Sequence, residues 1–65
     1  MNSRIEIDHT AYPKRLKALS EPSLRYIIKD AREAMLVMPD GPKAGYYMDE
    51  IHYASMELAR RRRKN

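Results

Sequence analysis

Acidic and histidine side chains meet once at a spacing that could bind a metal, in the segment Asp49-Glu50-Ile51-His52. An acid and a histidine three residues apart, as Asp49 and His52 are, share one face of a helix, and carboxylate-bridged di-iron bundles use such pairs. Those sites need four acids and two histidines that converge, and the preceding predicted helix offers, beyond its first turn, only Asp30 and Glu33. We therefore expect no metal site and interpret His52 as a solvated or interface histidine.

The residue types of hydrolases and nucleotide-binding enzymes occur without the patterns that catalysis needs. Serine, histidine and aspartate are present, but a chain of 65 residues leaves little room for a concave pocket. The only glycines, Gly41 and Gly45, belong to a predicted turn, so there is no glycine-rich phosphate loop. The absence of cysteine excludes a thiolate nucleophile, a disulfide and a cysteine-based zinc site. We expect no enzyme activity and no cofactor.

Positive charge is concentrated at the C-terminus. Of 13 lysines and arginines, eight share residues 1–59 with all nine acids, and the remaining five lie within residues 60–65. The sequence thus describes a near-neutral domain with a basic tail. Five adjacent bases exceed what the dipole of a helix C-terminus requires, so they are candidates for contact with phosphate or an acidic protein. These candidates are Arg60, Arg61, Arg62, Arg63 and Lys64.

The elements that must position these residues are helices. Ser20-Glu21-Pro22-Ser23 is typical of a helix start, with a hydroxyl N-cap and a proline in the first turn. Apolar residues then recur at intervals of three and four until Pro39-Asp40-Gly41-Pro42 ends the helix. The pattern predicts long helices near 21–38 and 44–62 and a short one from Tyr12 to Leu19. The expected core contains Leu16, Leu24, Ile27, Ile28, Ala31, Met35, Tyr47, Ile51, Ala54 and Leu58.

The predicted fold is all-α, an antiparallel helical hairpin with a short N-terminal helix and a cationic C-terminal tail. It forms one domain over residues 1–65, in which 1–10 is an extended arm and 60–65 the basic tail. So small a chain builds a marginal core, which a second copy or another protein would stabilise. With no cysteine and no apolar run of about 18 residues, we expect a cytoplasmic protein.

A second stripe on the last predicted helix marks a candidate partner-binding face. Its residues are Tyr46, Glu50, Tyr53 and Glu57, spaced four, three and four apart. Tyrosine suits an interface because it offers a large rigid area with a polar tip. Two uses stay open for this face, contact with another protein and cover by residues 5–19 of the same chain.

A basic stripe, Arg25, Lys29 and Arg32, lies on the preceding helix. Such a stripe can follow phosphates. In an antiparallel hairpin, however, Arg32 would approach Asp49 or Glu50, and Arg25 would approach Glu57. We expect intramolecular charge pairing here, and a tail that folding does not need because it follows the last periodic apolar residue.

Two segments, LRYIIKDA at residues 24–31 and PKAGYYMDEIHY at residues 42–53, carry a resemblance. Residues 16–63 resemble short uncharacterised helical proteins of tailed bacteriophages. The resemblance implies a setting, the cytoplasm of an infected bacterium, and an accessory protein that binds a host or phage component.

The function we expect is that of a small non-enzymatic helical interaction protein that binds a host or phage protein. The alternative is a nucleic-acid-binding protein that uses its basic tail or a ribbon-helix-helix-like N-terminus. Glu6 and Asp8 argue against the second form, since they would face phosphates. A structural role in a virion is a third class that the sequence leaves open.

Overall fold

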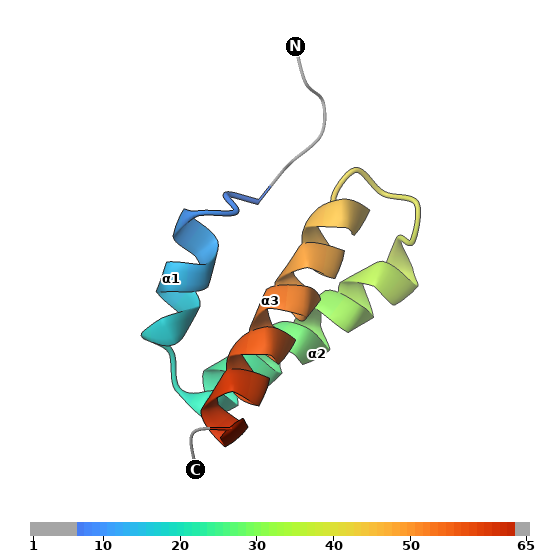
Figure 1. The fold of residues 1–65 in the computed structure, drawn as a ribbon. Helices are drawn as coiled ribbons and strands as arrows, with labels where there is room; N and C mark the ends of the chain where they lie inside the picture. The colour runs from blue at the N-terminus through green and yellow to red at the C-terminus, as the bar shows by residue number, and fades with distance from the viewer. Residues whose placement is uncertain (1–6, 64–65) are drawn as a thin grey trace.

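Three helices make up the part of the chain that the computed structural model describes, residues 7–63. They are α1 (Ala11–Lys17), α2 (Glu21–Val37) and α3 (Ala44–Arg63), and no strand occurs within that range (Figure 1). The prediction of an all-α fold is confirmed for residues 7–63, and the bounds of the two long helices differ from the predicted ones by a single residue each.

Side-chain hydrogen bonds to backbone N–H groups occur at the start of α2 and in the turn before α1. The Ser20 hydroxyl accepts a hydrogen bond from the Ser23 backbone N–H at 3.3 Å, as expected of an N-cap at the start of α2. Ahead of α1, the Asp8 carboxylate accepts the N–H groups of Thr10 and Ala11 at 2.9 and 3.0 Å. These bonds lower the pKa of Asp8, because they stabilise its charged form.

Helix α3 is the centre of the packing. It contacts α2 along the seam of the two long helices and α1 on another side, and the segment 38–43 joins α2 to α3 at one end (Figure 1). The buried cluster draws on all three helices and the segment before α1, and consists of Ile7, Tyr12, Leu16, Leu24 and Ala54. Ala31 is also buried.

The expected core is only partly buried. Leu16, Leu24, Ala31 and Ala54 are buried as predicted. Six further residues of that prediction are half-buried: Ile27, Ile28, Met35, Tyr47, Ile51 and Leu58. The reason is that α1 packs on α3 and covers only one side of the α2–α3 pair. The other side of the seam is therefore available to form surface grooves.

The ends of the predicted arm and tail fall outside the described residues. Of the arm, the structure describes Ile7, which is buried, and the turn that follows it. Of the predicted tail, Arg60 to Arg63 belong to α3, and Lys64 lies outside the described range. None of the described helices combines the length and the apolar character needed to cross a membrane.

Candidate interaction surfaces

The predicted partner-binding face of α3 lies against α1 and the turn before it. The Tyr12 hydroxyl donates a hydrogen bond to Glu50 Oε2 at 3.0 Å, and Tyr53 Oη lies 2.6 Å from His9 Nδ1. The rings of Tyr12 and Tyr53 are 6.1 Å apart, and Tyr46 packs against the buried cluster. The contacts of this face are thus those of cover by the N-terminal residues, the intramolecular use that the sequence left open.

Burial raises the pKa of both members of the Tyr12–Glu50 hydrogen bond. Burial raises the pKa of Tyr12, and the nearby charge of Glu50 raises it further. Burial also raises the pKa of Glu50, although the hydrogen bond from Tyr12 opposes the rise. The tyrosine therefore remains a neutral donor that holds α1 to α3.

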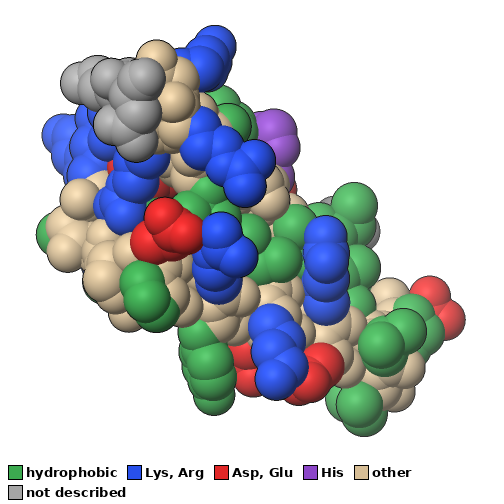
Figure 2. Space-filling model, turned by 90° about the horizontal axis from the view of Figure 1, so that it is seen from below, with side chains coloured by type: hydrophobic (Ala, Val, Ile, Leu, Met, Phe, Trp, Pro, Cys, Tyr) green, Lys and Arg blue, Asp and Glu red, His purple; other side chains and the backbone are tan. Residues whose placement is uncertain are grey.

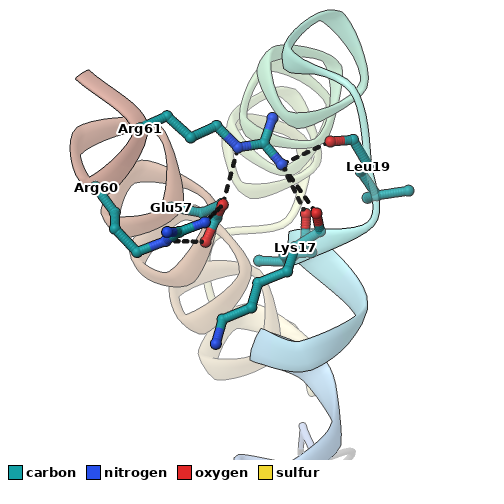
Figure 3. A network of polar contacts seen from close by, with 6 residues as sticks. Lys17, Leu19, Glu57, Arg60 and Arg61 are labelled. Carbon is teal, nitrogen blue, oxygen red and sulfur yellow. Dashed lines mark hydrogen bonds and ion pairs between the residues drawn. The ribbon is translucent and has the colours of Figure 1, made fainter. Parts of the chain in front are cut away.

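Glu57, the last residue of the predicted partner-binding face, is a buried acid. Its side chain is 6% exposed and accepts hydrogen bonds from two arginines of the next turn (Figure 3). Arg60 Nη2 and Nε lie 2.7 and 3.1 Å from its two oxygens, and Arg61 Nε lies 2.8 Å from Oε2. These hydrogen bonds, that from Arg60 first, lower the pKa of Glu57 to about 2. A charge so paired can be buried at modest cost.

Arg61 also binds the end of α1. Its Nη2 donates to the carbonyl oxygens of Leu16 and Lys17, each at 3.3 Å, and of Leu19 at 2.7 Å (Figure 3). Carbonyls at a helix C-terminus lack partners within the helix, and a cation satisfies them well. The prediction that folding does not need the tail stays a prediction, and this contact argues against it for Arg61, which joins α3 to α1.

The remaining described arginines of the tail are exposed. Arg62 and Arg63 line a groove of about 530 Å³ together with Arg25 of α2, and its other lining residues are Ser55, Leu58 and Ala59. Arg25 pairs with Glu21 one turn earlier at 2.8 Å, not with Glu57 as predicted, because Glu57 is already occupied by Arg60 and Arg61. Figure 2 shows lysine and arginine side chains spread over this end of the molecule.

The opposite end, where 38–43 connects the long helices, exposes apolar side chains. Leu36, Val37, Met38 and Met48 are exposed by 83%, 80%, 60% and 59%. We call these four residues the apolar end. Beside them lies a groove of about 400 Å³, lined by Ala34, Val37, Met38, Gly41, Pro42, Lys43, Ala44 and Tyr47. The signal that could have identified this surface is the run Met35-Leu36-Val37-Met38, because four adjacent apolar residues cannot all face the partner helix.

Asp49 and His52 of α3, the pair at metal-binding spacing, do not form part of a metal site in the described residues. Within residues 7–63, no three side chains of the metal-binding types come close enough together to hold an ion. Asp49 is half-buried and His52 exposed, and the ring of His52 lies 5.6 Å from that of Tyr53.

Comparison with known proteins returned no match to a family model, to a curated protein or to a solved structure.

Proposed function

We propose that this chain is a small non-enzymatic helical interaction protein that makes its protein–protein contact through the apolar end, and that the molecule bound there is a second copy of itself. The antiparallel hairpin of α2 and α3 would serve as the scaffold that presents this end. The resemblance of residues 16–63 to short phage proteins favours an accessory role in an infected bacterium.

The observation that carries this proposal is the exposure of the adjacent residues Leu36, Val37 and Met38, of which Val37 and Met38 line an apolar groove, together with that of Met48. Scattered single apolar residues are ordinary on a protein surface, whereas a contiguous group beside a groove is typical of an interaction site. Methionine suits such a site, because its unbranched, polarisable side chain adapts to the surface opposite.

A second copy is favoured as the occupant by the small size of the core. In the described residues only six apolar side chains are buried, and most of the α2–α3 seam is half-buried. Chains of this size commonly gain stability by oligomerisation. Two apolar ends brought together by a twofold axis would bury this surface in both copies.

Sedimentation equilibrium of the purified chain over a hundredfold concentration range tests the proposal. The wild type is expected to approach twice 7.7 kDa at high concentration. Val37→Lys should keep the protein monomeric, since it places a charge in the contact while suiting the C-terminal end of α2.

Tyr26→Lys is the matched control, because Tyr26 is 68% exposed and lies three turns earlier on the same face of α2. It should leave the dimer unchanged. A wild-type monomer at all concentrations would overturn the proposal, and so would equal weakening by both substitutions.

A further inference from the structure

The end of the molecule opposite to the connection between α2 and α3 gathers most of the positive charge that the structure describes. The last turns of α3, the start of α2 and the end of α1 meet there (Figure 1). Eight bases are found in these segments, Lys14, Arg15, Lys17, Arg25, Arg60, Arg61, Arg62 and Arg63, against two acids, Glu21 and Glu57.

The structure divides these arginines into two groups. Arg60 and Arg61 bind the buried Glu57, and Arg61 also binds the α1 carbonyls, so their guanidinium groups are committed to the fold. Within residues 7–63, Arg62 and Arg63 pair with no acid, and both are exposed. Their solvated guanidinium groups are free to bind an anion.

Arg25 brings a third guanidinium to the same groove from the neighbouring helix. Its ion pair with Glu21 is between side chains exposed by 62% and 56%, and such pairs contribute only about 0–1 kcal/mol. A phosphate could therefore compete for Arg25 at little cost. The groove of about 530 Å³ is thus lined by Arg25 of α2 on one side and by Arg62 and Arg63 of α3 on the other, and Ser55, Leu58 and Ala59 of α3 complete its lining.

The basic row on α2 extends the charge beyond the groove. Lys29 and Arg32 follow Arg25 by four and seven residues, so the row runs about 10 Å along one side of the helix. Both are exposed, and neither pairs with an acid in the part of the chain that the structure describes. Asp30 and Glu33 lie on other sides of α2, rotated by roughly 80 to 140° about the helix axis from Arg25, so they do not interrupt the basic row.

The composition of the groove favours a phosphate backbone over nucleotide bases or an acidic protein. Arginine binds phosphate through two parallel N–H bonds, and serine hydroxyls commonly contact phosphate as well. Among the described residues that line the groove there is no aromatic ring on which a base could stack and no amide side chain to read a base edge. A regular row of bases matches the even spacing of phosphates better than the irregular carboxylates of a protein.

We propose that the groove formed by Arg25, Ser55, Arg62 and Arg63 binds the phosphodiester backbone of nucleic acid without sequence preference. Arg60 and Arg61 take no part in this contact. The proposal is independent of the apolar end, which lies at the other end of the helix pair.

Fluorescence anisotropy with a labelled 20-base-pair DNA duplex tests the site. Three arginine contacts predict a slope of about −2.7 for log affinity against log salt, or about a 40-fold loss of affinity from 50 to 200 mM salt. The double variant Arg62→Ala/Arg63→Ala should bind at least tenfold more weakly at 100 mM salt, with a slope near −0.9. Arg25→Ala should lower the slope by about one unit.

The charge-matched control is Lys14→Ala/Arg15→Ala, which removes two exposed bases from α1 outside the groove. It should bind the duplex within threefold of the wild type. Equal losses for the two double variants would show attraction by net charge alone and overturn the proposal. So would stronger binding of labelled polyglutamate than of the duplex, since it would identify an acidic protein as the ligand.

Discussion

Arg61 should contribute more to the stability of the fold than a residue with a side chain exposed by 28% usually does. Its guanidinium contacts Glu57 at 2.8 Å and three carbonyl oxygens at the end of α1, the shortest at 2.7 Å. We choose Arg61→Met, because methionine keeps most of the aliphatic stem and removes only the charged group.

The expected loss is about 1.5–3 kcal/mol, the range for hydrogen bonds that involve a charged partner. Glu57 would keep its two bonds to Arg60, so the acid is not left unpaired and the larger cost of an isolated buried charge does not arise. For a domain of this size, a loss of about 2 kcal/mol lowers Tm by roughly 8–16 °C.

Thermal and urea unfolding, followed by circular dichroism at 222 nm, measure this loss. Arg62→Met is the matched control, since Arg62 is the next residue, has the same side chain and is exposed. It should change the free energy of unfolding by no more than about 0.5 kcal/mol. If the two variants unfold at the same temperature, the contacts of Arg61 do not stabilise the fold and the reasoning fails.

Four further substitutions have defined outcomes. Glu57→Gln should lower the free energy of unfolding most above pH 5, and progressively less as pH falls from about 4.5 to about 2, because the Glu57 ion pairs stabilise the fold only while the acid is charged. Urea titrations over a pH series measure this, and a difference from wild type that stays constant with pH would contradict it. Tyr12→Phe removes the bond to Glu50 and should cost about 1–2 kcal/mol in the same assay, whereas no loss would mean that solvent replaces it. Tyr53→Ala should lower the free energy of unfolding by about 2 kcal/mol, because it leaves a cavity beside Tyr12. An unchanged Tm would instead favour contact of the predicted partner-binding face with another protein. Gly45→Ala should raise stability by about 0.4–1 kcal/mol, since a Cβ there meets nothing within 4 Å, and a lower Tm would refute it.

The helices could be predicted because their signals are local. Ser20, Pro22 and the proline-flanked turn act within a few residues, and the apolar period of α2 spans four turns. The position of α1 could not be predicted in the same way. It depends on contacts between residues about 40 apart, such as Tyr12 with Glu50, for which no spacing in the sequence is diagnostic.

Glu57 shows how a sequence pattern can be present and still be misinterpreted. A glutamate on a helix is rarely buried, so the sequence placed Glu57 in a surface face that contacts a partner. Yet arginines follow it by three and four residues, the two intervals at which helix side chains meet. The pairing was therefore visible in the sequence, whereas the covering helix that buries the pair was not.

The bond between Arg61 and the end of α1 also has a consequence for how the chain folds as it is synthesised. It joins residue 61 to residues 16–19, so it closes a loop of more than 40 residues, most of the polypeptide. Helix α1 is synthesised before α3, and its C-terminal carbonyls gain this partner only after residue 61 has been translated and has emerged from the ribosome. Until then the nascent chain can form the turns of α2 but cannot secure α1 to α3, so the packing of α1 should follow the formation of the last turns of α3.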